Sequence, residues 1–557
     1  MASRFFRAMP WRLQNGFGAL LFLVAVLACG VAQAAPVPAG NAASTAVQQN
    51  LQQLQQANQQ NAAPKVNGKV VVTSPLSRAE LPKAGGPRFL LKSVSFSPAS
   101  VFLTQAELDR ITSRYIGLKV DFAQISALVR DINDLYAKKG IVTASAILPP
   151  QTLKGGVLKV ELVEGRVGVV QIVGKHRTRD QYIFDRVHFA RQGVVDVPRA
   201  ARDITWFNKT NQAQLKLLLQ PGAAFGLTNL SLGIAEPPEN TLQFFADDYG
   251  VPSTGRVEFG AYYRGYDFLG DDDNLTVYAT DSAGSLAGTV SYDVPITPSG
   301  TRVAASYTRS AIAVVDGPDA PLHVTGNSQA VSLTVSQPLI ATGNWAVLAS
   351  LSGVYGTSQS DSAAVPLVDS TTTKEAYGLS ISYADTGRSF TLAPQLIYAQ
   401  ASDHLAGTTA DILLGAGTFS AAYSLGKDFS VNAAGAFQIS NTKLLPGDLL
   451  FQIGGASSVR GYEADSVAGD SGYYAQLELH HTLPGPVSGL DGFVFTDVGQ
   501  VYSTFPAVTT LASVGTGVSW NIDNKASAEL SVGVPVVKAL AGQPDATVYL
   551  RVVANAF

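Results

Sequence analysis

From residue 239 to the end of the chain, apolar and polar side chains alternate in segments of about ten residues. Turn sequences such as Pro298-Ser299-Gly300 separate these segments. A membrane-spanning β-strand has this pattern, because its side chains face lipid and the barrel interior in turn. At roughly 20 residues for each strand and its connection, the region predicts about 16 strands. We expect the barrel to be closed, since an open strand edge would leave amides in hydrocarbon without hydrogen-bond partners.

A soluble β-sandwich would also alternate, but it does not explain why so many strands continue without a second core. The chain finishes on an aromatic residue, Phe557, as outer-membrane barrels commonly do. Arg551 and Asn555 share its parity, where that signature usually has apolar residues. The clearest examples of the alternation are residues 256–264, 475–480 and 526–534.

Composition favours a strand-rich membrane protein. Charged residues make up 15% of the chain, well below the quarter or so found in soluble globular proteins. Hydrophobic residues make up 46%, yet beyond the amino-terminal region no apolar run reaches the ~20 residues of a membrane-spanning helix. The net charge of −3 and the lack of a Lys and Arg cluster argue against a nucleic-acid partner.

The amino terminus has the pattern of an export signal, predicted at residues 1–34. Arginines precede an apolar run at residues 17–28, and the small-residue site Ala32-Gln33-Ala34 follows. The only cysteine, Cys29, lies in a segment that loosely resembles a lipoprotein processing site, so lipidation is an alternative. The later site is the better cleavage site, and cleavage there leaves a mature chain without cysteine, which suits an oxidising periplasm.

Residues 35–87 are rich in Gln, Asn, Ala and Pro and lack the apolar surface needed for a packed core. This composition predicts a linker. Within it, a short helix around residues 44–61 and a disordered tether are both compatible with the sequence.

Two similar units follow, at residues 88–165 and 166–238, each predicted to pack one sheet against two helices. In the first, Thr104 and Glu107 predict a capping box, and residues 122–136 have helical spacing. The barrel is predicted at residues 239–557. The remaining predicted elements are strands at 89–96, 142–147, 156–164, 167–173, 213–220 and 226–235, and helices at 180–189 and 198–208.

The sequence predicts no catalytic, metal or cofactor site. His480 and His481 are adjacent on a strand, so they lie on opposite faces and cannot converge on one metal. We find no nucleophile-elbow or phosphate-loop pattern. The acidic run at residues 271–274 lacks the spaced ligands and distal Glu of a calcium loop, so it is predicted to be a solvated turn. We therefore expect no cofactor and a protein that is not an enzyme.

Two short motifs in the barrel region contain Arg460 and Asp497, which we expect to form an ion pair. The first is Val459-Arg460-Gly461-Tyr462, and the second is Phe495-Thr496-Asp497-Val498-Gly499. An Arg inside a narrow lumen needs a carboxylate, which the planar guanidinium can hold through two parallel hydrogen bonds. Gly461 would allow a tight turn, and Gly499 would leave space for the loop. The alternative is a surface-loop arginine and an ordinary lumen acid.

These motifs resemble those of the two-partner secretion transporters (TpsB; the ShlB/FhaC/HecB family) among the outer-membrane barrels that carry polypeptide-transport-associated (POTRA) domains. Asp248-Tyr249-Gly250-Val251-Pro252-Ser253-Thr254-Gly255 looks like the first hairpin of the same family, although any Pro-Ser-Thr-Gly turn would look similar. The order of two POTRA-like units and a barrel matches the family over nearly the whole mature chain. The resemblance implies that the first motif tips a loop folded into the lumen, facing the second motif. It also implies an amino-terminal helix that plugs the lumen at rest, which residues 44–61 could supply.

The resemblance implies an outer-membrane pore with periplasmic amino-terminal domains. These domains would capture an unfolded client protein, encoded nearby, and the pore would pass it to the cell surface in type V secretion. Expected partners are this client, outer-membrane lipid and the general barrel-assembly machinery that inserts the chain. The alternatives are an assembly factor that inserts other barrels and a diffusion porin, for which the two units would have no purpose.

Overall fold

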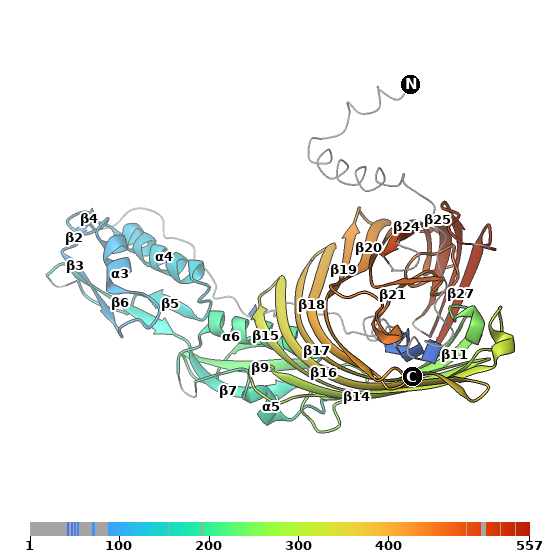
Figure 1. Cartoon of the computed structure of the whole chain (residues 1–557). Helices are drawn as coiled ribbons and strands as arrows, with labels where there is room; N and C mark the ends of the chain where they lie inside the picture. The colour runs from blue at the N-terminus through green and yellow to red at the C-terminus, as the bar shows by residue number, and fades with distance from the viewer. Residues whose placement is uncertain are drawn as a thin grey trace.

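The computed structural model shows two small α/β units beside a large β-barrel (Figure 1). It describes residues 87–557 except 154, 191–192, 486, 503–507, 524, 541 and 557, and nearer the amino terminus residues 42–43, 46–47, 49–51, 53–54 and 70–72. The signal peptide predicted at 1–34, with Cys29, lies outside the described residues. In the part of the chain that is described, no helix is both long and apolar enough to cross a membrane.

The first unit is a three-stranded sheet, β3-β6-β5, packed against two helices. The capping box expected at Thr104 is present at the start of α3, where Thr104 and Glu107 exchange hydrogen bonds between side chain and backbone. Hydrogen bonding to Lys139 and to Thr104 lowers the pKa of Glu107 to about 2. Leu128 and Ile132 of α4 are fully buried in the core. The elements are β2 (Phe89–Leu90), β3 (Ser93–Ser97), α3 (Gln105–Thr112), β4 (Lys119–Val120), α4 (Phe122–Lys138), β5 (Ala144–Ile147) and β6 (Val157–Glu164).

The second unit is a four-stranded sheet in the order β1-β8-β9-β7, packed against two helices. Its edge strand β1 comes from the linker and pairs in parallel with β8. The Asp196 carboxylate caps α6 by accepting the backbone N–H of Arg199 at 2.9 Å. Ile204 and Phe207 of α6 are fully buried. The elements are β1 (Val70–Val72), β7 (Arg166–Val173), α5 (Asp180–Phe184), α6 (Val197–Thr210), β8 (Gln214–Pro221) and β9 (Leu227–Ala235).

A single residue, Gly165, connects the two units between β6 and β7. Its N–H donates to the carbonyl of Thr143 at 2.9 Å, and its carbonyl accepts the N–H of Val195 at 2.8 Å. A Cβ at this position would lie 2.8 Å from both the Thr143 carbonyl and Thr228 Oγ1. The junction is therefore short, filled, and hydrogen-bonded to both units.

The barrel is closed and has 16 antiparallel strands, which confirms the predicted strand number and closure. Its members follow chain order except that β20 pairs with β23, because the intervening segment folds inward. The strands are β10 (Asn240–Asp247), β11 (Glu258–Tyr266), β12 (Asn274–Ser282), β13 (Ser285–Pro295), β14 (Arg302–Ala313), β15 (Val324–Ala341), β16 (Trp345–Ser362), β17 (Val365–Asp385), β18 (Arg388–Asp403), β19 (Thr408–Ser424), β20 (Phe429–Ser440), β23 (Ser471–Thr482), β24 (Leu490–Tyr502), β25 (Val508–Ile522), β26 (Ala526–Pro535) and β27 (Thr547–Asn555). Two short helical turns lie in connections, η2 (Pro252–Thr254) and η3 (Ala320–Leu322).

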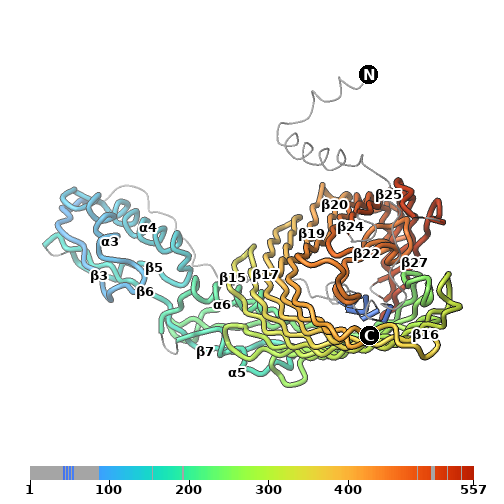
Figure 2. Tube along the Cα trace, viewed as in Figure 1, coloured from blue at the N-terminus to red at the C-terminus, as the bar shows by residue number. Residues whose placement is uncertain are grey.

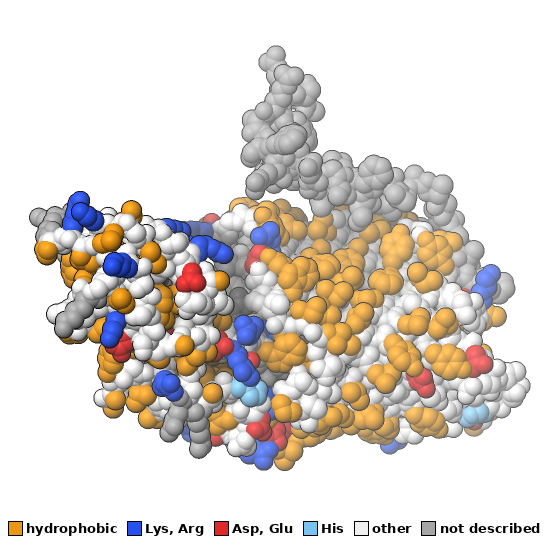
Figure 3. All heavy atoms as spheres, turned by 90° about the vertical axis from the view of Figure 1, so that its left-hand side faces the viewer, with side chains coloured by type: hydrophobic (Ala, Val, Ile, Leu, Met, Phe, Trp, Pro, Cys, Tyr) orange, Lys and Arg blue, Asp and Glu red, His pale blue; other side chains and the backbone are white. Residues whose placement is uncertain are grey.

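The alternation in sequence becomes an apolar exterior and a polar interior. On β16, Leu351 and Tyr355 are exposed on the outer surface. Ser352 points the other way, and its hydroxyl lies 3.0 Å from that of Thr334 on β15. Hydrophobic side chains cover much of the barrel face seen in Figure 3. Such a surface is stable in lipid and would be unstable in water.

The sheet closes where β10 meets β27, and this pairing covers only Gln243–Asp247 of β10. Polar side chains on the inner face support it: Arg551 Nη1 lies 3.4 Å from Asp247 Oδ2, and Gln243 Nε2 donates to Asn555 Oδ1 at 2.8 Å. Arg551 and Asn555 face the lumen and join the two ends of the sheet. This explains why polar residues stand at these positions, where the carboxyl-terminal signature of outer-membrane barrels usually has apolar ones.

Two predicted elements differ from the structure. The strand predicted at 89–96 divides into β2 and β3, because the backbone N–H of Leu91 donates to the carbonyl of Leu118 and that of Lys92 to Gly156. The helix predicted at 180–189 ends at Phe184. Beyond it, the backbone N–H of His188 donates to the Asp203 carboxylate instead of continuing a helix.

Two arginine variants of β16, one on each face of the strand, should distinguish its lipid-facing side from its lumen-facing side. Leu351→Arg is expected to destabilise the barrel by up to about 2 to 4 kcal/mol, the cost of a lipid-facing Arg at the bilayer midplane, which falls towards the membrane interfaces. Ser352→Arg, one position along on the inner face, should cost much less. Urea unfolding of both variants refolded into lipid vesicles measures this, and equal losses would contradict the assigned orientation.

Candidate functional site

The connection between β20 and β23 folds into the barrel rather than projecting away from it, as Figure 2 shows for the orange chain around β22. It contains η4 (Gly447–Leu449) and a hairpin of β21 (Phe451–Ile453) with β22 (Val467–Gly469). Val459 and Tyr462 of this loop are fully buried with Val501 of β24 and Leu511 of β25. The loop is therefore packed against the inner wall of the barrel.

Arg460 lies at the tip of this loop, in contact with Asp497 on β24. Arg460 Nε and Nη2 donate to the two Asp497 carboxylate oxygens, each at 2.8 Å, and the Arg460 backbone N–H donates to Oδ2 at 3.0 Å. Nη1 donates to Glu478 of β23 at 2.5 Å. The guanidinium also lies 3.5 Å from the ring centroid of Phe495. The side chains of Arg460 and Asp497 are almost fully buried, so their charges are compensated by each other rather than by solvent.

Gly461 and Tyr462 attach the loop to the last strands of the barrel. Gly461 has φ +89°, a conformation that costs little only for glycine. Its N–H donates to the Tyr549 hydroxyl at 2.9 Å, and that hydroxyl donates to the Tyr462 carbonyl at 2.6 Å. The Tyr462 hydroxyl donates to the Val537 carbonyl at 2.7 Å and accepts the backbone N–H of Ala512 at 3.2 Å. The loop tip is thus fixed through its backbone as well as through Arg460.

The second motif makes room for the first. A Cβ on Gly499 would lie 2.9 Å from Val459 Cγ2, so a larger residue would push the loop away. Phe495 lies over Gly515 of the next strand, where a Cβ would come within 2.2 Å of its ring. This positions the ring beneath the guanidinium of Arg460.

The first hairpin lies beside the same loop. The Asp248 carboxylate accepts the backbone N–H of Leu550 on β27 at 2.8 Å, which continues the closing pair of strands past the end of their ladder. The Tyr249 ring meets the Tyr549 ring edge-on, with centroids 6.2 Å apart. Tyr549 therefore touches both the hairpin and the lumen loop. The other predicted hairpin residues form its turn: Gly250 N–H donates to the Arg256 carbonyl, Thr254 lies in η2, and Gly255 has φ +112°.

The described residues between 42 and 54 are helical and lie inside the barrel, drawn in blue within the ring of strands in Figure 1. Leu54 packs against Tyr262 and Tyr278 of the inner wall. Polar contacts are more numerous: Asn50 hydrogen-bonds Thr280 and Thr289, Gln53 hydrogen-bonds Glu258 and Tyr278, and Gln49 contacts Asp465 of the lumen loop. The sequence indicated few apolar positions here because the lumen wall that receives this helix is itself polar.

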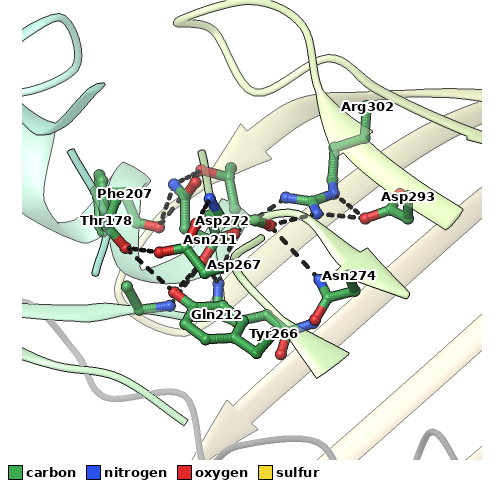
Figure 4. Close-up of polar contacts among 12 residues, drawn as sticks. Thr178, Phe207, Asn211, Gln212, Tyr266, Asp267, Asp272, Asn274, Asp293 and Arg302 are labelled. Carbon is green, nitrogen blue, oxygen red and sulfur yellow. Dashed lines mark hydrogen bonds and ion pairs between the residues drawn. The ribbon is translucent and has the colours of Figure 1, made fainter. Parts of the chain in front are cut away.

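The acidic run at 271–274 is not the solvated turn that we predicted. Asp272 and Asp273 are both fully buried. The Asp272 carboxylate accepts the backbone N–H groups of Gln212 and Ala213 from the second unit, at 2.9 and 3.0 Å. On its other side it forms an ion pair with Arg302 of β14 at 3.1 Å (Figure 4). This turn therefore binds the second unit to the barrel.

Neighbouring contacts reinforce this joint. The Thr178 hydroxyl donates to Asp267 at 2.9 Å (Figure 4), and desolvation raises the pKa of Asp267 above its usual range. Arg179 forms an exposed ion pair with Asp271. The sequence did not predict this joint, because the partners of Asp272 lie far away in the chain. The run of consecutive carboxylates was the only sequence signal at this turn.

As expected, His480 and His481 point to opposite faces of β23 and do not form a cluster. His480 faces the interior between Glu478 and Asp491, whereas His481 stacks on Phe429 with ring centroids 4.2 Å apart. Among the described residues, no group of three or more His, Cys, Asp and Glu side chains is arranged to hold a metal ion.

A closed barrel with an apolar exterior, two α/β units beside it, and its own loop and helical segment in the lumen is the architecture of an outer-membrane transporter. The model of the haemolysin secretion/activation protein ShlB/FhaC/HecB family matches residues 204–520, and the POTRA domain, ShlB-type, matches residues 89–165. The family match covers more than half of the chain, so the chain belongs to this family. It is an outer-membrane transporter of the two-partner secretion type, with POTRA architecture on the periplasmic side.

Individual relatives agree with this assignment. The chain is 24% identical to the outer membrane transporter CdiB of Dickeya dadantii, over 83% of this chain and 86% of the relative. It is 22% identical to the heme/hemopexin transporter protein HuxB of Haemophilus influenzae, over 77% and 80%. The solved structure of CdiB from Escherichia coli matches 94% of this chain and 99% of that chain, with a TM-score of 0.67 and 20% identity, and shows the shared fold.

Removing Arg460 should destabilise the barrel interior. Arg460→Ala leaves the buried Asp497 carboxylate uncompensated, and the expected loss is about 3 to 5 kcal/mol in the free energy of unfolding. The double variant with Asp497→Ala should lose less than the sum of the two single losses, because the buried Asp497 carboxylate is no longer left without its partner. Urea unfolding of each variant measures these differences. Lys538→Ala, which removes an exposed pair with Asp545, is the control and should change little.

Cutting the joint should loosen the second unit. Asp272→Ala removes the acceptor shared by Gln212, Ala213 and Arg302, so the second unit should sample more positions relative to the barrel. Spin labels at Lys216 and Lys427, both exposed, would report a broader distance distribution. Asp271→Ala removes only the solvent-exposed pair with Arg179 at the same joint, so it should broaden the distribution much less than Asp272→Ala does. Equally narrow distributions in wild type and Asp272→Ala would show that the joint is held by other contacts.

Proposed function

We propose that this chain moves one large unfolded client protein from the periplasm through its lumen to the cell surface. What supports this most directly is that two segments of the chain itself occupy the lumen, the helical residues between 42 and 54 and the loop between β20 and β23. Asn50 and Gln53 hold the helical segment through hydrogen bonds that water or client amides can replace. A plug held in this way suits passage of a polypeptide on demand better than steady diffusion of solutes.

The periplasmic units are proposed as the entry site. In this proposal residues 88–165 and 166–238 are two POTRA domains, residues 35–87 are the linker and 239–557 the barrel. A sheet edge can bind an extended chain through backbone hydrogen bonds, independently of most side chains. That mode of binding fits an unfolded client, which presents its backbone throughout.

Arg460 is proposed to hold the lumen loop in the arrangement that keeps the barrel competent for transport. The loop either remains as part of the conducting wall or moves during passage. The sequence contains no phosphate-loop pattern, so the proposed driving force is folding of the client outside the cell. The proposed partners are the client, outer-membrane lipid and the general barrel-assembly machinery; no cofactor and no catalytic role are proposed.

Export measurements test the role of the ion pair. Arg460→Ala and Asp497→Ala should each strongly reduce the amount of client at the cell surface, because each leaves a buried group without its partner. Lys538→Ala should export normally. Undiminished export by both motif variants, at wild-type levels of folded barrel, would remove the motif from the mechanism.

Two further measurements separate the alternatives. Deleting residues 89–236 should abolish client export, whereas a diffusion porin would keep its solute flux. Depleting the whole protein should remove one exported protein from the cell surface. If many outer-membrane proteins disappeared instead, the chain would be a factor that inserts other barrels.

A further inference from the structure

One histidine lies next to the ion pairs that hold the lumen loop. His480 points into the barrel from the same face of β23 as Glu478, two positions before it. Its ring lies between two carboxylates: Nε2 is 2.9 Å from Glu478 Oε2, and Nδ1 is 2.7 Å from Oδ1 of Asp491 on β24. The His480 side chain is only 18% exposed, so these carboxylates, rather than water, are its main polar neighbours.

The two contacts determine the protonation state of the ring. An ionised carboxylate only accepts hydrogen bonds, whereas a neutral imidazole carries a proton on one of its two nitrogens. Each carboxylate also accepts a second hydrogen bond, Glu478 from Arg460 Nη1 and Asp491 from the Thr482 hydroxyl. A neutral ring would therefore direct a nitrogen lone pair at one carboxylate. Only the doubly protonated imidazolium can donate to both.

The surrounding charges also favour the imidazolium. Besides His480, this part of the lumen holds four carboxylates and two guanidinium groups. Across the ladder on β20, the residues opposite His480 and Glu478 are the neutral Ser430 and Asn432. A positive charge on His480 therefore reduces a local excess of negative charge. The charged groups are Glu478 on its own strand, Asp491 and Asp497 on β24, Arg460 on the lumen loop, Glu529 on β26 and Arg551 on β27.

Glu478 connects His480 to Arg460. Its Oε2 contacts the His480 ring, and its Oε1 accepts Arg460 Nη1 at 2.5 Å, so one carboxylate holds two cationic groups. Aromatic rings form a second connection. His480 stacks on Phe493 with ring centroids 5.0 Å apart, and Phe493 lies 6.3 Å from Phe495. Phe495 lies beneath the Arg460 guanidinium, so the contacts that begin at His480 reach Arg460 from two sides.

We propose that His480 is a positioning residue for Arg460: as an imidazolium it holds Glu478 in place, and this keeps the tip of the lumen loop against the barrel wall. When His480 loses its proton, one of the two carboxylates loses its donor and Glu478 becomes free to turn away from Arg460. The inference rests on the proposed role of Arg460 in transport and makes the attachment of the loop dependent on pH.

Exposure of the loop tip can be measured with a thiol at Ser458. This residue lies two positions before Arg460 and is only 4% exposed, so a maleimide reaches Ser458→Cys only when the tip leaves the wall. The full chain is used in lipid vesicles, with Cys29→Ser removing the only native cysteine. Near neutral pH, His480→Gln should raise the labelling rate about tenfold or more, the effect of losing one hydrogen bond to a charged group.

The adjacent histidine provides the matched control. His481 lies on the opposite face of the same strand and stacks on Phe429, away from Arg460. His481→Gln should therefore label at the wild-type rate. Equal labelling rates in His480→Gln and in the protein with His480 intact would overturn the positioning role.

The pH dependence distinguishes this role from simple loss of packing. The labelling rate of His480→Gln is divided by that of the protein with His480 at each pH, which cancels the ionisation of the reporter thiol. The pH range is about 5 to 9, which spans the usual imidazole pKa of about 6.5. The ratio should be about ten while His480 is charged and should fall towards one as His480 loses its proton. A purely structural role would give a ratio that does not change with pH.

Nuclear magnetic resonance of protein labelled with ¹⁵N at histidine reports the proton directly, because protonated and unprotonated ring nitrogens have separate chemical shifts. The His480 signals are those that disappear in His480→Gln. Both ring nitrogens of His480 should be protonated near neutral pH, and their titration should follow the labelling ratio. A neutral His480 ring near neutral pH, or a ratio that stays constant while His480 titrates, would overturn the proposal. Neither measurement uses client export, so a failure of the secretion proposal would show in the export experiments alone.

Discussion

The closed ladder of backbone hydrogen bonds in the barrel is the constraint on which everything else in this chain depends. In hydrocarbon every strand must have two partners, and a ring is the arrangement that supplies them. A ring of 16 strands encloses a space too wide for wall side chains alone to fill. The chain fills part of that space with its own loop and helical segment, which therefore need polar contacts to a polar wall.

These contacts are unequal in strength, and the difference matters for function. The loop is attached by a buried ion pair, a ring beneath the guanidinium and several backbone hydrogen bonds around Tyr549. The helical segment is attached mainly by neutral amide and hydroxyl groups. Neutral hydrogen bonds exchange with water at small net cost, whereas a lone buried charge is expensive. Of the two lumen segments, the helix is therefore held by the weaker contacts.

Much of this arrangement could be predicted from sequence, and the failures have physical causes. Period-two alternation is clear in strands such as β11, β23 and β26 because lipid and lumen enforce it, so strand number and closure could be inferred. Arg460 and Asp497 are in contact as their chemistry suggested. The carboxylates at 271–273 led to the wrong prediction, because a turn covered by another domain has the same composition as one in water. Strand β1 could not be foreseen, since Val70–Val72 acquire a partner only through a sheet formed almost 150 residues later in the chain.

Gly165 fixes one more property of the molecule. A single residue lies between the two units, and it is hydrogen-bonded to both of them. This short connection restricts rotation of one unit relative to the other. Together with the Asp272 joint, they form a continuous arm of set length that ends at the mouth of the barrel. Such an arm keeps the sheet of the first unit at a nearly constant distance from the mouth of the barrel.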